Sequence, residues 1–345
     1  MGKFYDGTRL LSMKDINGNE PEIYICSSNR SAGKTTFFNR WCVKKFIENK
    51  EQFILLYRYN YELSDIAHKF FDEIKALFYP HYTMTSKSCA KGVYHELFLN
   101  NTTCGYAVSI NNADQLKKMS HIFSKCVRIL FDEFQSESGH YCSNEVQKFI
   151  SLHTSIARGG GKQVRRVPVY MLGNFVSLLN PYYVELGISQ RLRIDTNFLR
   201  GNGYVLEQGF YTSASDAQKK SAFNIAFEKN SYVSFASEKC YLNDNNAFIE
   251  RPSGRSTYVC TVKYESGLYA IRLYPDKGIV YCDNSVDETF PRKIVVTTAD
   301  HEINYVMLKQ NDVFISMLRW YFEKGCFRFK DLKCKNTILN LCAYR

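Results

Sequence analysis

The sequence predicts an α/β domain over residues 1–200 and a smaller α+β domain over residues 231–345, joined by a linker or lid at 201–230. Three observations predict this arrangement. Short apolar runs alternate with stretches of helical spacing in the first part, which is typical of strands alternating with helices. A small, polar loop joins the first apolar run to the first helical stretch. After residue 231, short strands separated by turn residues replace the alternation. A chain of 345 residues is long enough for two such domains.

The loop at 28–36 has the features of a phosphate-binding loop. It follows an apolar strand at 22–27 and passes directly into a helix with apolar residues through 37–47. A helix that starts at such a loop presents backbone N–H groups and its positive dipole end to an anion. Lys34 is expected to reach the β- and γ-phosphates of ATP, and the Thr35 hydroxyl to bind Mg²⁺. The residues expected to surround the nucleotide are Ser28, Asn29, Arg30, Ser31, Ala32, Gly33, Lys34, Thr35 and Thr36.

The first position of this loop departs from the usual pattern. The pattern G-x-x-x-x-G-K-[ST] begins with Gly, whereas this chain has Ser28. Serine is costly there if the turn needs a positive φ, and acceptable if only small size matters. An ordinary strand-to-helix turn rich in Ser and Asn is the alternative interpretation, but Gly-Lys-Thr at such a junction favours a nucleotide site.

A later apolar strand, at 127–134, carries two carboxylates towards its end. Asp132 is expected to hold Mg²⁺ through water, and Glu133 to polarise the water that attacks the γ-phosphate. A strand that simply ends in solvated acids is the alternative, which the phosphate loop argues against. Glu directly after Asp favours the additional-strand, catalytic-glutamate (ASCE) class of P-loop ATPases, with a RecA-like fold.

In the ASCE class another strand lies between the loop strand and the Asp strand, and residues 167–174 are the expected supplier. This run ends in Asn174, at the edge where the γ-phosphate would lie. Asn174 is therefore the candidate sensor of that phosphate. A routine turn at Gly-Asn is the alternative.

A helix expected at 143–158 ends in Arg158, before three glycines. Arg158 is interpreted either as a cation that complements the helix dipole or as an arginine finger offered to ATP on a neighbouring subunit. Arg165 and Arg166 compete for the second role. His153 on the same helix is expected to be packed or solvated rather than a ligand.

The remaining predicted elements follow from the same patterns. In the first part we expect strands at 53–59 and 190–195, helices at 62–78, 115–124 and 217–227, and a hairpin over 92–110. In the second part we expect strands at 258–264, 268–274 and 278–282, and a helix at 313–322.

The second domain has the meander and helix of a ribonuclease H-like fold, but it lacks an obvious nuclease centre. Its close acidic residues, Asp283, Asp287 and Glu288, fall in one loop, whereas such nucleases need carboxylates that hold two metals. We therefore expect no nuclease activity. Aromatic and basic residues alternate over 327–335. This alternation is interpreted either as amphipathic edge structure or as a segment that binds a nucleic-acid backbone and stacks on its bases.

Composition limits the partners. The net charge of +11 indicates polyanionic partners without separating DNA, RNA and membrane surfaces. The 12 cysteines contain no C-x-x-C pair, which predicts free thiols in a reducing cytosol and no zinc site. No apolar run approaches the length of a membrane span, and the first residues do not form a secretory signal.

The chain resembles the DNA-packaging ATPases of phi29-like bacteriophages over most of its length. The resemblance is carried by the phosphate loop with its internal Arg30 and by residues 51–63, 131–134 and 174–182. It implies a homopentameric ring that docks on the portal of an empty prohead and drives double-stranded DNA inward. It also implies a structural packaging RNA, a vestigial nuclease domain, and a location in the host cytoplasm, transiently at the portal vertex.

The resemblance also assigns roles to single residues. It matches Lys34 and Thr35 to phosphate and Mg²⁺, Asp132 and Glu133 to metal and catalysis, and Arg158 to the finger. In addition, Lys117 or Lys118 falls near a lysine that acts on the nucleotide in the family. Two other functions stay open: a large terminase with an active nuclease, and a nucleic-acid-binding scaffold with a relic phosphate loop.

Overall fold

The computed structural model describes residues 4–158, 162–189, 191–192, 196–230, 232–233, 236, 249–309 and 312–343. The chain divides into two compact units, which are described separately. Unit 1 consists of Met1–Phe175 with Asp195–Lys239, and unit 2 of Val176–Ile194 with Cys240–Arg345. No helix of the described residues is long and apolar enough to cross a membrane.

Unit 1 is built on a nine-stranded sheet of order β3-β4-β5-β2-β6-β7-β1-β9-β8. Its central strands are parallel, and the outer β3, β4 and β8 pair antiparallel. Central strands buried on both faces explain why the sequence shows continuous apolar runs rather than alternation. The strands are β1 (Ile23–Ser28), β2 (Gln52–Tyr57), β3 (Met84–Cys89), β4 (Tyr94–Leu99), β5 (Thr102–Ser109), β6 (Cys126–Phe131), β7 (Val169–Gly173), β8 (Phe198–Gly201) and β9 (Tyr204–Gly209).

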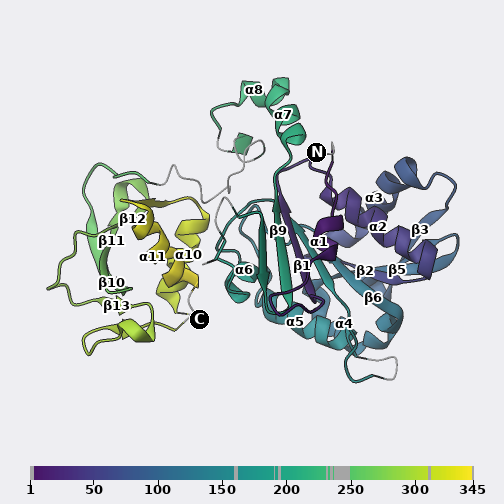
Figure 1. Ribbon diagram of the computed structural model, residues 1–345, viewed down its shortest axis with the longest axis horizontal. Coiled ribbons are helices and arrows are strands. Elements are labelled where there is room, and N and C mark those ends of the chain that lie inside the picture. Colours follow the sequence, from purple (N-terminus) through teal and green to yellow (C-terminus); the bar gives the residue numbers. More distant parts are fainter. Residues whose placement is uncertain are drawn as a thin grey trace. The chain divides into compact units, whose positions relative to one another are not determined.

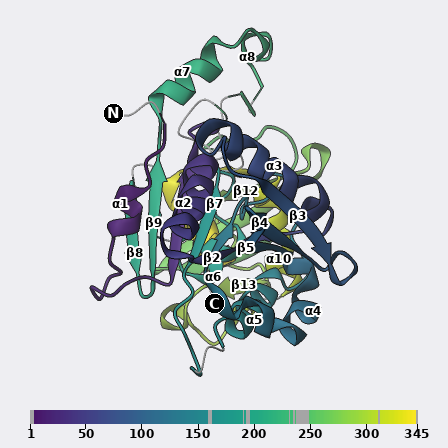
Figure 2. The same ribbon diagram turned by 90° about the vertical axis from the view of Figure 1, so that its right-hand side faces the viewer.

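Helices cover both faces of this sheet, as Figures 1 and 2 show. On one face, side chains of α1 (Thr8–Ser12), α2 (Lys34–Asn49) and α3 (Tyr61–Phe78) share a core with alternate strand residues. On the other face lie α4 (Ala113–Lys118) and α5 (Glu145–Ile156). This three-layer arrangement confirms the predicted α/β class.

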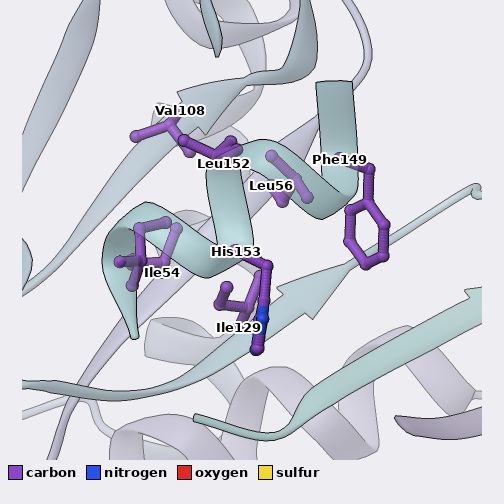
Figure 3. A pocket seen from close by; sticks show the side chains of 8 residues that line it. Ile54, Leu56, Val108, Ile129, Phe149, Leu152 and His153 are labelled. Atoms are coloured by element: carbon purple, nitrogen blue, oxygen red, sulfur yellow. The ribbon is translucent and has the colours of Figure 1, made fainter. Parts of the chain in front are cut away.

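Helix α5 packs tightly against the sheet. Phe149 and Leu152 of α5 and Ile54 and Ile129 of the sheet line a small space between helix and sheet (Figure 3), which has no room for a water molecule. The His153 Nε2 atom lies 2.9 Å from the Val167 carbonyl oxygen, so this histidine is a packed residue, as predicted.

The strand order confirms the central topological prediction. β7 lies between β1, which carries the phosphate loop, and β6, which ends just before Asp132. The strands expected at 53–59 and 127–134 are β2 and β6, and the helices expected at 62–78 and 143–158 are α3 and α5. The helix expected at 115–124 is instead the short α4 followed by a 3₁₀ helix at Ser120–Lys125.

The hairpin expected over 92–110 is present as β4 and β5, whose connection holds Asn100 and Asn101 at φ of 47° and 61°. The sequence did not predict the neighbouring β3. Its residues are polar and incompletely buried, so an apolar pattern is missing there. β3 therefore forms by pairing with β4 rather than by burial of its own side chains.

The expected end of the first domain at residue 200 needs correction. β9 pairs in parallel with β1 and belongs to the main sheet, so residues 204–209 are not part of a linker. Beyond it, α7 (Thr212–Lys220) and α8 (Ala222–Ala226) cover the helix expected at 217–227. Most of the strand expected at 190–195 lies outside the described residues.

Unit 2 carries a six-stranded sheet of order β14-β13-β10-β11-β12-β15. The expected meander is present, because β10, β11 and β12 pair antiparallel in sequence. β13 joins β10 in parallel, and α11 packs on β12 and β15. The elements are α6 (Pro181–Glu185), β10 (Thr257–Tyr264), β11 (Gly267–Tyr274), β12 (Ile279–Asp283), β13 (Lys293–Val295), β14 (Val306–Met307), α10 (Val313–Glu323), β15 (Phe327–Phe329) and α11 (Leu332–Ala343). This is the α+β, ribonuclease H-like arrangement that was predicted.

The aromatic residues of the tail are buried. Phe327 and Phe329 of β15 are both 0% exposed and stack on each other within unit 2. Between them, Arg328 donates to the Gly325 carbonyl at 2.9 Å and pairs with Glu250 at 3.4 Å. Buried rings cannot stack on bases, so the first part of this alternation is amphipathic edge structure.

Candidate nucleotide site

The loop between β1 and α2 has the conformation of an anion-binding helix start. Gly33 caps α2 with a φ of 92°, and Lys34 is the first helical residue. The first N–H groups of any helix lack intrahelical acceptors, so this turn of α2 has donors to offer a phosphate. Ser31 also has a positive φ, 60°, a strained conformation of the kind that concentrates at ligand sites.

Ser28 fits its position without strain. It is the last residue of β1, in extended conformation, and pairs in register with Gly209 of β9. The positive φ angles of the loop fall on Ser31 and Gly33 instead. The missing glycine at the first position therefore costs the backbone nothing here.

Lys34 and the predicted sensor Asn174 meet. The Lys34 Nζ atom donates to Asn174 Oδ1 at 2.6 Å, which joins the phosphate loop to the residue after β7. The Lys34 side chain is buried, and burial lowers its pKa, while the negative charge of Asp132 opposes this shift. The two residues thus point at one place above the carboxyl ends of β1 and β7.

Asp132 and Thr35, the two expected metal residues, are also in contact. The Asp132 carboxyl has a pKa raised by burial, an effect that the positive charge of Lys34 and the hydrogen bond from Thr35 oppose. A hydroxyl and a carboxylate side by side are the hard oxygen donors that Mg²⁺ prefers next to substrate phosphates. The residues present therefore fit a magnesium ion.

Glu133, the expected catalytic base, has a left-handed backbone with a φ of 51°. Its side chain remains exposed to solvent. Partial desolvation by the surrounding protein still raises the pKa of its carboxyl, and the negative charges of Asp132 and Glu137 raise it further. A raised pKa brings a carboxylate closer to the range in which it accepts a proton efficiently.

Arg58, directly after β2, holds the backbone at Glu133. Its guanidinium donates to the Glu133 carbonyl at 3.2 Å and to the Phe134 carbonyl at 2.7 Å. Its Nε atom pairs with the Glu145 carboxylate at 3.0 Å, and both side chains are buried. The sequence alone did not indicate a role for Arg58. The available signal was a lone charge at the carboxyl end of an apolar strand in a predicted parallel sheet.

Glu137 was also missed, and it links several loop residues. Its carboxylate accepts from Arg30 at 3.2 Å, from Asn174 at 3.2 Å and from the Tyr232 hydroxyl at 2.9 Å. The neighbouring Asn29 points elsewhere, because its amide pairs with the backbone of Tyr211 at 3.0 and 3.1 Å. Of these two polar side chains, Arg30 is the one held beside the sensor.

The three candidate arginines differ in their contacts. Arg165 donates to the carbonyl oxygens of Phe123 and Ile156, both at 2.8 Å, and to that of Cys126. Arg166 donates to the Pro21 carbonyl at 2.6 Å. Arg158 is exposed. It follows α5, which runs back from the carboxyl edge of the sheet, so about 20 Å of strand separate it from its own phosphate loop.

Lys117 and Lys118 lie on α4, which follows β5. Three strands separate β5 from β1, a lateral distance of about 19 Å at ordinary strand spacing. Lys117 pairs with Asp114 of its own helix at 2.7 Å. The fold therefore does not bring either lysine to the phosphate loop of the same chain.

Comparison with known proteins identifies the family. The family model described as podovirus DNA encapsidation protein (Gp16) matches residues 2–344. The chain belongs to this family. Among curated relatives, the DNA packaging proteins of Bacillus phages PZA and phi29 are each 22% identical over 342 residues, covering 98% of this chain and 96% of the relative.

Two solved structures share the fold over nearly the whole chain. A chain of the bacteriophage Phi-29 viral genome packaging motor assembly has a TM-score of 0.54 at 22% identity, covering 97% of both chains. A chain of the Phi-28 gp11 DNA packaging motor has a TM-score of 0.56 at 16% identity, covering 99% of this chain and 97% of that one. At these identities the likeness establishes the fold, so the chemistry must be argued from the site.

Proposed function

We propose that this member of the podovirus encapsidation family hydrolyses ATP to move double-stranded DNA into a preformed prohead. The observation that carries the proposal is the Lys34 to Asn174 contact of 2.6 Å beside Asp132 and Glu133. A loop lysine, a metal carboxylate, a base and a polar sensor from three neighbouring strands form the constellation that phosphoryl transfer to water requires. The names of the curated relatives support DNA packaging as the work that hydrolysis drives.

Each residue has a separate task in this mechanism. Lys34 and the N–H groups at the start of α2 hold the phosphates, and Asn174 orients the γ-phosphate. Thr35 and Asp132 would hold Mg²⁺, which neutralises phosphate charge when bound. Glu133 accepts the proton of the attacking water, while Arg58 fixes the backbone that carries it.

Arg158 is proposed to complete the site of a neighbouring subunit. Its exposure and its distance from its own loop support a role between subunits, whereas Arg165 and Arg166 are held by backbone carbonyls of their own chain. Lys117 or Lys118 is proposed to act in the same way, since α4 lies too far from the loop of its own chain. Both assignments require a ring, which the family resemblance implies to be a pentamer.

The proposed partners are the portal of the prohead, double-stranded DNA and a structural packaging RNA, with the host cytoplasm as the site of action. Basic residues of the ring would hold the DNA backbone without reading its sequence. The net charge of +11 supports a polyanionic partner.

A working nuclease is the less supported alternative. Asp283 pairs with Arg272 at 3.0 Å, and the described residues contain no group of three metal-ligating side chains. Incubation with plasmid DNA and Mn²⁺ should leave the plasmid intact. Cleavage that disappears in Asp283→Asn would support the terminase alternative instead.

The function is tested with purified chain, proheads and linear DNA. Full-length protein should show DNA-stimulated ATP hydrolysis and should protect DNA from added nuclease only when ATP is present. Binding of DNA without any ATP hydrolysis would support the scaffold alternative and contradict the proposal.

The neighbour assignment is tested with mixed subunits in the same assay. Arg158→Ala should lose at least about 100-fold in ATPase rate. Mixing it with Lys34→Ala, which keeps its own arginine, should restore part of the rate. Arg165→Ala is the matched control. It should lower thermal stability, and mixing it with Lys34→Ala should not restore any ATPase rate that is lost. If no mixture of Arg158→Ala with Lys34→Ala gains ATPase activity, Arg158 does not act between subunits.

A further inference from the structure

An exposed aromatic side chain lies directly on the phosphate loop. Phe4 is 61% exposed. Its Cβ, Cγ and Cδ1 atoms lie 3.5–3.9 Å from the position that a Cβ on Gly33 would occupy. A large apolar ring that is more than half exposed beside the first turn of this helix is a candidate contact for the apolar part of the ligand.

The residue after Phe4 anchors this segment. The Tyr5 N–H donates to the Ala32 carbonyl of the loop at 2.8 Å, and the Tyr5 hydroxyl donates to Glu207 of β9 at 2.7 Å. The Tyr5 ring packs edge-on against Phe37 of α2 at 5.5 Å. Gly7 packs against the same two rings, where a Cβ would lie 2.5 Å from the Phe37 ring and 3.1 Å from the Tyr5 ring. Tyr5 is therefore a positioning residue that fixes Phe4 over the loop.

The direction of the triphosphate places the nucleoside on the same side. The groups that act on the γ-phosphate, Glu133 and Asn174, follow β6 and β7, which lie on one side of β1. The α-phosphate and nucleoside must then extend towards the other side of the loop. β9 borders β1 on that side, and Tyr5 is bonded to β9 through Glu207.

We propose that Phe4 is the base-stacking residue of the nucleotide site, with Tyr5 as its anchor. The inference rests on the proposed function, because it needs a nucleotide on the loop. A phenyl ring stacks on the face of any purine, so the contact contributes affinity for adenine and guanine nucleotides alike and does not select between them. Selection of ATP over GTP then belongs to other groups.

The test compares ligands with and without a base on the full-length chain. Calorimetric titrations use Mg²⁺ with ATP, with GTP and with inorganic triphosphate. Phe4→Ala should bind ATP and GTP each about 10-fold more weakly, within the range for loss of one stacked base, and should bind triphosphate as the parent does. Phe4→Tyr should restore nucleotide affinity. Phe223→Ala, which removes a ring that is 72% exposed on α8, is the matched control and should change nothing.

Each other outcome contradicts a distinct claim. Unchanged ATP affinity in Phe4→Ala, with triphosphate still bound, overturns the stacking role alone. An equal loss for ATP and triphosphate also overturns it, because Phe4 would then shape the loop rather than contact the base. A parent chain that binds neither ligand contradicts the proposed function itself.

Discussion

Removing Arg58 should cost stability and activity for two separable reasons. Arg58 and Glu145 form a buried ion pair at 3.0 Å, and the same guanidinium donates to the carbonyls of Glu133 and Phe134. Arg58→Met leaves the Glu145 carboxylate buried without its counter-charge, which costs about 3–5 kcal/mol. For a unit of this size that loss corresponds to a decrease in Tm of roughly 6–20 °C.

A second substitution separates the two effects. Glu145→Gln removes the buried charge but keeps an oxygen that can accept from the Cys142 N–H, now at 2.7 Å. Arg58→Met/Glu145→Gln should therefore recover about 1–3 kcal/mol relative to the sum of the single changes. ATP hydrolysis should stay low in the double variant, because nothing replaces the donors to the backbone at Glu133.

The assay uses the two tryptophans of the chain. In a Trp320→Phe background, the fluorescence of Trp41 on α2 reports the unfolding of unit 1 in urea. Steady-state ATPase measurements on the same proteins test the predicted loss of ATP hydrolysis. A loss of less than about 1 kcal/mol in Arg58→Met, or additivity of the two changes within about 0.5 kcal/mol, would contradict the role of the buried ion pair.

The nucleotide site and unit 2 give further predictions. Ser28→Gly should change ATP affinity, measured by calorimetric titration, by no more than about twofold. It should lower the free energy of unfolding by about 0.5–1 kcal/mol, because Ser28 is extended in a strand. Gly33→Ala should weaken ATP binding in the same titration, because alanine strains the backbone at a φ of 92°. The acid limb of the pH profile for ATP turnover should lie above the ordinary pKa of glutamate, because a raised pKa keeps Glu133 protonated to higher pH. For the same reason Glu133→Gln should raise the Tm of the nucleotide-free chain at neutral pH, and this gain should vanish as the pH falls through the Glu133 pKa; an equal gain at all pH values would contradict it. Asp283→Asn should destabilise unit 2 in chemical denaturation by about 1–3 kcal/mol through loss of its Arg272 partner, and an unchanged midpoint would argue against that pairing.

The sequence predicted the parts of unit 1 that depend on burial and on ligand chemistry. A central parallel strand must be apolar along its length, so β1, β2, β6 and β7 were visible as runs. The loop motif and the Asp132-Glu133 pair indicated the candidate site, and the rule that ASCE domains insert a strand gave the position of β7 and hence of Asn174.

The parts that could not be predicted depend on pairing and on distant contacts. β3 is a polar edge strand and shows no pattern of its own. The domain boundary near 200 was misplaced because β9 comes after a Gly-Asn-Gly turn that reads as a linker. The contacts of Arg58 with Glu145 and of Glu137 with Arg30 join residues 87 and 107 positions apart, which no local spacing reveals.

The most direct test of the central claim is one measurement on Glu133→Gln. Full-length variant, bound to proheads with DNA, is mixed with radiolabelled ATP and Mg²⁺, and bound nucleotide and released phosphate are measured in a single turnover. The account predicts ATP bound as tightly as by the parent and phosphate release slowed at least about 100-fold. Phosphate released at the parental rate would show that the carboxylate after β6 is not the base, and would contradict the proposed mechanism of hydrolysis.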